Sequence, residues 1–127
     1  VTSSIFGCHE ASRAISSASC TFGGYAALLN ENNTTLTLTQ TDGTSVVFTT
    51  DSSLTKAGST NLTIGTLALG SAADATESLW TALNMTISFG NLDMILSPST
   101  YGSETEITLT QNFGCESDWN CGAKISF

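Results

Sequence analysis

Glu104 and Glu106 stand two residues apart in the run ETEITLTQNF. Side chains at positions i and i+2 of a strand point to the same face of a sheet, so the two carboxylates would share one face. Paired carboxylates are the groups with which glycosidases protonate a leaving oxygen and activate the attacking group. No partner for the two carboxylates and no aromatic residue that would line a pocket can be read from the neighbouring sequence. We therefore expect a solvated face rather than a catalytic pair.

His9 is the one histidine of the chain and the other candidate for acid–base chemistry. Serines are abundant, but none lies in the G-x-S-x-G turn that exposes the nucleophile of an α/β-hydrolase. We interpret His9 as a surface residue. The chain is predicted to have no catalytic residue and not to be an enzyme.

A third group of polar side chains lies in the segment CESDWNC near the C-terminus, and it consists of Glu116, Asp118, Trp119 and Asn120. Carboxylate and amide oxygens are ligands that Ca²⁺ prefers, and a tryptophan beside polar groups suits a sugar. The remaining interpretation is a clamped turn whose tryptophan packs against the domain or a neighbouring subunit. We favour this packing role, and the sugar and calcium alternatives stay open. No metal and no other cofactor are predicted.

Four cysteines, Cys8, Cys20, Cys115 and Cys121, predict a disulfide framework, because an even number in a small chain is typical of one. The spacings favour one bridge at each end of the chain, and crossed pairings that tie the two ends together stay open. Zinc is the competing interpretation, but the chain contains no C-x-x-C. Disulfides indicate an oxidising location: secreted, at the cell surface or on the outside of a virion.

The charge balance excludes several partners. The chain of 127 residues has 11 acidic and 3 basic side chains and a net charge of −8. Nucleic acids and anionic membrane surfaces both require clustered Lys and Arg, so neither is expected as a partner. The sequence has no apolar run long enough for a membrane-spanning helix, and no membrane insertion is predicted. The chain begins at Val1 rather than Met, which we take as a hint that a leader has been removed.

The elements that must position these residues begin with the hairpin TLTLTQTDGTSVVFTT, Thr35–Thr50. A three-residue turn that ends at Gly43 would place this glycine in the left-handed region and pair Leu38 with Val46. The apolar side chains of the two strands then share one face, whereas a two-residue turn would divide them between both faces. Since a buried face specifies the register, the three-residue turn is predicted.

One helix is predicted from Ser71 to Asn84, with Ser71 as N-cap, Asp74 as its capping-box partner and Asn84 as the C-terminal cap. Further strands are expected over residues 61–69, 85–89, 92–96, 104–113 and 124–127, with Gly90-Asn91 as a hairpin turn. The fold class is therefore α+β: a mainly antiparallel, sandwich-like sheet with one packed helix.

Residues 1–30 are predicted to form an N-terminal arm or irregular layer, and residues 31–127 the β-rich domain with its helix at about 71–84. The first segment contains apolar residues without a regular period: Ile5, Phe6, Phe22, Tyr25, Leu28 and Leu29. Apolar side chains that do not recur at helix or strand spacing often pack against a partner protein. These residues are therefore predicted to contact other subunits. The alternative is an irregular layer folded over the chain's own sheet.

Three stretches, in order, resemble a small domain that recurs in structural proteins of tailed bacteriophages: TLTLTQTDGTSVVFTT, ADATESLWTALN and EITLTQNFG. The resemblance covers about residues 34–114 and leaves out the N-terminal segment and the cysteine loop, since the four cysteines are not part of the pattern. It implies a place on the virion exterior as a decoration, knob, fibre or tail component. It brings no catalytic residues.

The expected function is that of a non-enzymatic structural protein in an extracellular assembly, most simply a surface or decoration component of a phage virion. Its partners would be other copies of itself or other structural proteins of that assembly. Two alternatives stay open. One is a subunit of a bacterial or archaeal surface filament, and the other is a carbohydrate-binding adhesin that uses Trp119.

All four cysteines are predicted to be oxidised in the mature protein. Removing one bridge from a small extracellular domain costs about 2–5 kcal/mol of stability. Intact-mass measurement after thiol labelling under denaturing conditions, without reductant, should show no labelled cysteine. Four labelled thiols would contradict the disulfides and favour the metal site.

Overall fold

Eight strands, one α-helix and one short 3-10 helix make up the described part of the chain, which is residues 2–3, 19–21, 28–40, 43–112 and 122–127 of a computed structural model. In chain order the elements are β1 (Thr2–Ser3), β2 (Ser19–Thr21), β3 (Thr35–Thr39), β4 (Ser45–Asp51), η2 (Lys56–Gly58), β5 (Thr63–Gly65), α1 (Ala72–Ser88), β6 (Met94–Ser97), β7 (Glu106–Gln111) and β8 (Gly122–Ser126).

The strands form two four-stranded sheets, in the orders β1-β3-β4-β5 and β2-β8-β7-β6. Most neighbours are antiparallel, and the exceptions are the parallel pairs β4–β5 and β2–β8. The strands β1 and β2 both come from the first thirty residues, yet they pair with β3 in one sheet and with β8 in the other. One helix with mainly antiparallel sheets confirms the predicted α+β class.

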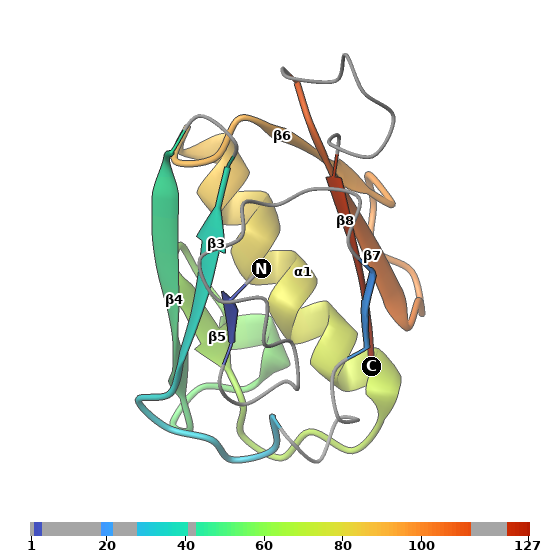
Figure 1. The fold of residues 1–127 in the computed structure, drawn as a ribbon. Coiled ribbons are helices and arrows are strands. Elements are labelled where there is room, and N and C mark those ends of the chain that lie inside the picture. Colours follow the sequence, from blue (N-terminus) through green and yellow to red (C-terminus); the bar gives the residue numbers. More distant parts are fainter. Residues whose placement is uncertain (1, 4–18, 22–27, 41–42, 113–121) are drawn as a thin grey trace.

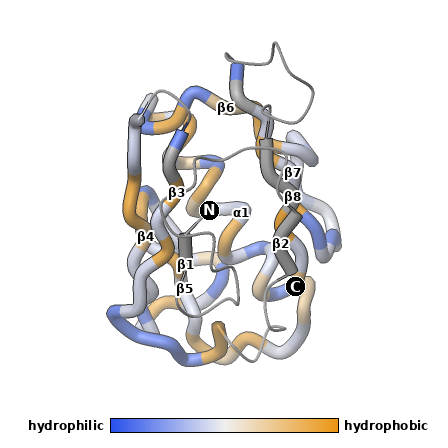
Figure 2. Tube along the Cα trace, in the orientation of Figure 1, coloured by the Kyte–Doolittle hydropathy of each residue, from blue (hydrophilic) through white to orange (hydrophobic). Residues whose placement is uncertain are grey.

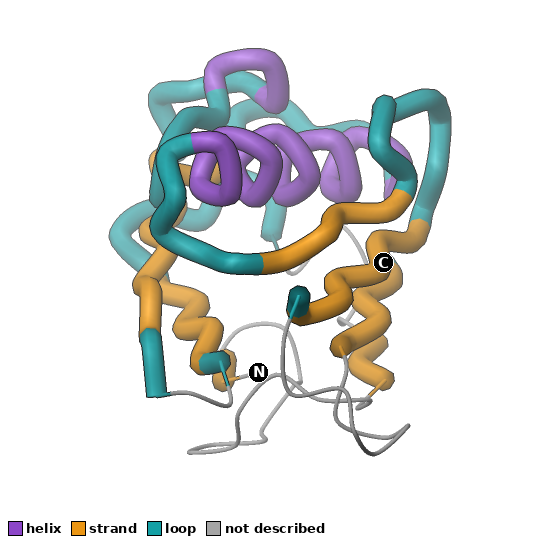
Figure 3. The backbone as a smooth tube through the Cα atoms, turned by 90° about the horizontal axis from the view of Figure 1, so that it is seen from above, coloured by secondary structure: helices purple, strands orange, loops and turns teal. Residues whose placement is uncertain are grey.

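The helix α1 lies between the two sheets and contacts β5 of one sheet and β6 and β7 of the other. Figure 1 shows it running diagonally through the molecule, with β3 and β4 on one side and β7 and β8 on the other. Seen from above, it lies across both sheets (Figure 3). A sandwich of two sheets in direct contact is therefore not confirmed, because the helix supplies much of what covers their inner faces.

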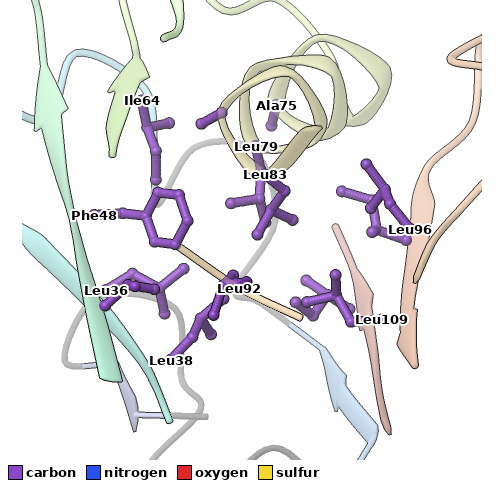
Figure 4. Packing of buried hydrophobic residues seen from close by; sticks show 14 of the residues in the cluster. Leu36, Leu38, Phe48, Ile64, Ala75, Leu79, Leu83, Leu92, Leu96 and Leu109 are labelled. Carbon is purple, nitrogen blue, oxygen red and sulfur yellow. The ribbon is translucent and has the colours of Figure 1, made fainter. Parts of the chain in front are cut away.

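The hydrophobic core collects side chains from all three layers. The first sheet supplies Leu36, Leu38, Phe48 and Ile64, the helix Ala75, Leu79 and Leu83, and the second sheet Leu96 and Leu109 (Figure 4). Each fully buried aliphatic or aromatic side chain of this size stabilises the fold by about 1.5–3 kcal/mol relative to an exposed one. Hydrophobic stretches accordingly follow the strands and the helix, whereas the most hydrophilic residues lie in connecting loops (Figure 2).

The register of the β3–β4 hairpin is as predicted, with Leu38 opposite Val46. The Gln40 amide donates to the Thr44 carbonyl at 2.8 Å, which closes a three-residue turn. Gly43 ends the turn with φ +91°, the left-handed region in which a Cβ is disfavoured. The other two residues of the turn lie outside the described part of the chain.

The start of α1 is also as predicted. Ser71 is the N-cap, and its hydroxyl accepts a hydrogen bond from the Asp74 amide at 3.1 Å. The Asp74 carboxylate, however, accepts from the Gly70 amide at 2.8 Å rather than from the N-cap amide of a standard capping box. This carboxylate therefore fixes the residue that leads into the helix.

The end of α1 differs from the prediction. The helix continues past Asn84 to Ser88, so the predicted strand over residues 85–89 and the cap at Asn84 are wrong. The Asn91 amide donates to the Thr86 carbonyl and the Gly90 amide to the Ile87 carbonyl. Gly90 has φ +80°, and this arrangement is a Schellman motif. The predicted Gly90-Asn91 hairpin turn is thus the end of a helix.

Burial explains why the helix is longer than the sequence pattern indicated. Thr86 is fully buried, and its hydroxyl donates to the Ala82 carbonyl at 2.8 Å, which satisfies a polar group inside the core. Ala82 and Leu83 are fully buried on the same side of the helix. Packing of this face outweighs the strand preference of the β-branched residues, which is less than about 1 kcal/mol per residue.

Gly65 in β5 has no room for a side chain, because a Cβ there would overlap the backbone carbonyl oxygen of Thr55. A backbone group cannot move aside as a flexible side chain would. We expect Gly65→Ala to destabilise the protein by about 2 kcal/mol or more, measured by urea unfolding. Gly70→Ala is the matched control, since its Cβ would lie 3.4 Å from the Asp74 carboxylate, an ordinary contact. Equal stability of the two variants would contradict the close approach.

Candidate functional site

An open groove of about 560 Å³ lies beside the start of β7. It contains both carboxylates that the sequence singled out. Its described lining is Ser97, Pro98, Ser103, Glu104, Thr105, Glu106 and Thr108. The hydroxyl and carboxylate groups of this lining can form hydrogen bonds with a polar ligand. None of these lining residues has an aromatic ring or a cationic side chain.

The two carboxylates reach the groove from different elements. Glu106 is the first residue of β7, whereas Glu104 belongs to the preceding loop, so the prediction of two neighbours on one strand is wrong for Glu104. The Glu104 carboxylate accepts a hydrogen bond from the Gly102 amide at 2.7 Å. This contact shapes the loop over residues 98–105, so Glu104 has a structural partner within its own loop.

Two aromatic residues hold the 98–105 loop against α1, and we name them the aromatic clamp: Trp80 and Tyr101. The Trp80 indole donates to the Pro98 carbonyl at 2.8 Å. The Tyr101 hydroxyl bonds to the carbonyls of Ala73 and Glu104. The two rings lie 5.9 Å apart between centroids, tilted by 47°. Burial, with smaller contributions from nearby carboxylates, raises the pKa of Tyr101, so its hydroxyl keeps the proton that it donates.

Lys56 joins η2 to the first turns of α1. Its ammonium lies 2.7 Å from a carboxylate oxygen of Asp74 and 3.6 Å from one of Glu77. The hydrogen bond from Lys56, followed by that from the Gly70 amide, lowers the pKa of Asp74. The same bond with Asp74 raises the pKa of Lys56.

An amine beside two carboxyls is also the composition from which an amide crosslink between side chains could form. That reaction joins the Lys56 nitrogen to the Asp74 carbonyl carbon with loss of water, and it requires a neutral amine and a protonated carboxyl. The pKa of Lys56 is raised and that of Asp74 is lowered, so both groups stay charged at neutral pH. The arrangement is therefore that of an ion pair at a helix N-terminus, where a carboxylate is favoured.

Asp51 ends β4 and forms a tight turn with Ser53, whose amide and hydroxyl both donate to its carboxylate, at 2.9 and 2.6 Å. The hydroxyl bond, followed by the amide bond, lowers the pKa of Asp51. The next residue, Ser52, donates its amide to the Asn32 side chain at 3.1 Å. Across the described ranges, no three His, Cys, Asp or Glu side chains converge in a way that could hold a metal ion.

Most of the remaining predicted site residues lie outside the described part of the chain. These are His9, Cys8, Cys115, Cys121, Glu116, Asp118, Trp119, Asn120, Ile5, Phe6, Phe22 and Tyr25. Cys20 is described only through the backbone of β2, where it pairs with Ile125 of β8. The disulfides and the role of the CESDWNC loop thus stay predictions.

Leu28 and Leu29 were expected to contact other subunits. Leu28 is fully buried in the core of its own chain, so this prediction is wrong for Leu28. Leu29 is partly buried against the same core. The sequence pattern does not reveal that these two leucines pack against the core. They lie in the turn at residues 28–30, which has no regular period of buried side chains.

The sequence pattern did not reveal the aromatic clamp or the role of Gln40. Gln40 is almost fully buried, and its side-chain oxygen accepts the Asp93 amide at 2.7 Å, which joins the hairpin to the residues before β6. A glutamine directly after an apolar strand and a tyrosine three residues after a proline are weak signals. Both act through partners far away in the sequence.

The fold is thus an α+β domain of two small sheets around one helix, with an open polar groove. Comparison with known proteins gives no match to a protein-family model, a curated protein or a solved structure. The likeness to tailed-phage domains therefore stays a prediction. No helix in the described ranges is both long and apolar enough to cross a membrane.

Asp74→Asn should lower the melting temperature by roughly 1–4 °C at neutral pH, because it removes a charge that favours the helix N-terminus. Since the pKa of Asp74 is lowered by folding, its contribution is complete above the ordinary value of 3.8 and is lost as the pH falls below it. The difference between wild type and variant, followed by thermal unfolding, should therefore shrink below pH 3.8.

Glu77→Gln is the matched control, because Glu77 lies on the same helix and contacts the same lysine at the longer distance of 3.6 Å. It should lower the melting temperature less than Asp74→Asn. An equal effect would show that the loss reflects net charge rather than the contacts of Asp74.

Proposed function

We propose that this chain is a non-enzymatic structural component of an extracellular assembly, and that the assembly is a tailed-phage virion in which it occupies the surface. The proposal starts from the three stretches that resemble virion structural domains. It implies an oxidising, extracellular location and partners that are copies of the chain or other structural proteins. What supports it further is the character of one exposed sheet face.

The observation that carries the proposal is the outer face of the first sheet. We name it the threonine face, and it consists of Thr35, Thr37, Ser45, Val47, Thr49 and Thr63. These side chains are short, so packing them against a partner costs little rotamer entropy. None is charged, and the cores of protein interfaces are depleted in charge. Such a face is stable in water and can also be covered by another protein at little cost in side-chain entropy.

The titratable groups give a second, weaker support. Perturbed pKa values often mark catalytic sites, since catalysis requires shifted acids and bases. Among the described residues, the groups with shifted pKa values are Asp51, Lys56, Asp74 and Tyr101, and each shift arises from burial or from contacts that hold a turn, a helix end or a loop. Their perturbation is therefore explained by the fold without a reaction.

Antibodies against the recombinant chain test the proposal. Virus particles purified by density gradient from the natural source of the sequence should carry immunogold label at regular surface positions, and peptides of the chain should be detected by mass spectrometry in the same band. Pre-immune serum is the control.

Two other outcomes would contradict the virion. Label along cell-surface filaments would assign the chain to a filament instead. Label on neither structure, together with glycan binding that Trp119→Ala abolishes, would assign it to an adhesin.

A further inference from the structure

Strand β2 contains Cys20, and the position of this strand beside β8 limits which cysteine can bond to Cys20. β2 runs parallel to the last part of β8, with Cys20 opposite Ile125. Figure 1 shows β2, in blue, beside the C-terminal end of β8. Cys115 and Cys121 precede the other end of β8, which begins at Gly122. Most of the length of β8 therefore separates Cys20 from the start of that strand.

The register excludes a bridge between Cys20 and Cys121. Gly122 is three residues before Ile125 on β8, and Cys20 lies on the neighbouring strand. With a rise of about 3.3 Å per residue and strands about 4.8 Å apart, the Cα atoms of Cys20 and Gly122 are about 11 Å apart. Cys121 is bonded to Gly122, so its Cα lies about 3.8 Å from that of Gly122 and about 7 Å or more from that of Cys20. Bridged cysteines usually have Cα atoms about 4.4–6.8 Å apart.

The register also excludes a bridge between Cys20 and Cys115. Ile107 of β7 lies level with Cys20, since both pair with the same residue of β8, and β7 is two strand spacings from β2. Asn112 is five residues beyond Ile107, and its amide still bonds to the residue before β6. The Cα atoms of Asn112 and Cys20 are therefore about 19 Å apart. The three residues from Asn112 to Cys115 span at most about 11 Å, which leaves a gap of about 8 Å.

We propose that Cys20 is bonded to Cys8, and Cys115 to Cys121, so that each bridge closes a loop within one end of the chain. Four cysteines allow three pairings, and both pairings that join the two ends would require Cys20 to bond to Cys115 or Cys121. The limits follow from chain length and hold for any conformation of the residues outside the described ranges. The second bridge also suits the fold, because β7 and β8 are hydrogen-bonded neighbours at the ends that flank it.

Each bridge forms by exchange with a disulfide oxidant, such as oxidised glutathione. Two cysteine thiols lose two protons and two electrons as one S–S bond forms, and the disulfide of the oxidant is reduced to two thiols. Because neither bridge joins the ends of the chain, the two sheets are held together by the core around α1 rather than by a covalent link. This inference goes beyond the proposed function and is tested independently of it.

A tryptic digest without reductant distinguishes the pairings, because the chain has three basic residues at useful positions. The full chain is first refolded with reduced and oxidised glutathione. Free thiols are then alkylated with N-ethylmaleimide in denaturant, which also prevents exchange during digestion. Trypsin cleaves after Arg13, Lys56 and Lys124 and gives the peptides 1–13, 14–56, 57–124 and 125–127.

Mass spectrometry should show 1–13 joined to 14–56, with 57–124 released alone and lighter by two hydrogen atoms than after reduction. Either pairing that joins the ends of the chain would instead link all three of these peptides into one species, and that species would overturn the inference. Alkylated cysteines in the wild type would overturn it as well.

Two double variants give a matched comparison. Cys8→Ser with Cys20→Ser removes one proposed bridge, so Cys115 and Cys121 should remain protected from alkylation. Cys8→Ser with Cys115→Ser leaves two cysteines that the register holds apart, so both should be alkylated. The opposite pattern of labelling would contradict the proposed pairing, and the wild-type digest decides the question by itself if either variant fails to fold.

Discussion

The burial of one helix against two separate sheets is the interaction on which the rest of this structure depends. A small sheet with one apolar face cannot leave that face in water and must cover it with another layer. Leu79 and Leu83 of α1 are fully buried in the cluster that also contains Phe48 of the first sheet and Leu109 of the second. The helix thus gives both sheets a common core.

Buried and partly buried polar groups fix how the segments of the fold are joined. The Gln40 side chain connects the hairpin to the residues before β6, the Ser59 hydroxyl accepts the Gly65 amide at 2.9 Å, and Trp80 binds the Pro98 carbonyl. An unsatisfied polar group inside a core costs about 1–3 kcal/mol, so each of these bonds disfavours alternative arrangements. The result is a body whose outer faces are held in fixed positions. An assembly subunit of the kind proposed here requires such a body, because its contacts repeat.

Charged and uncharged polar residues occupy different positions on the described surface. Charged residues make up 11% of the sequence, well below the roughly 25% of typical soluble domains. Several of the charged groups that are described hold turns and helix ends, as Asp51 and Asp74 do. Exposed strand positions are left to threonine and serine, which keep a sheet soluble and yet are easily covered by a partner.

By itself, the sequence determined those local features for which the residue pattern is compatible with only one local structure. The hairpin register follows because only one turn length places Leu38 and Val46 on a common face, and Gly43 provides the conformation that this turn needs. Ser71 determined the start of the helix because its side chain caps a nearby amide. Both signals act within a few residues, so no distant partner is needed to read them.

Only the tertiary structure decided the features in which local preferences are nearly balanced. Residues 85–88 could form a strand or extend the helix, and burial of Thr86 beside Ala82 selects the helix. The separation of Glu104 from the strand of Glu106 depends on a loop held by Trp80 and Tyr101, whose partners are far away in sequence. The placement of β1 and β2 in different sheets is equally non-local. Such choices depend on packing energies that arise only when distant segments meet, and a single sequence does not display them.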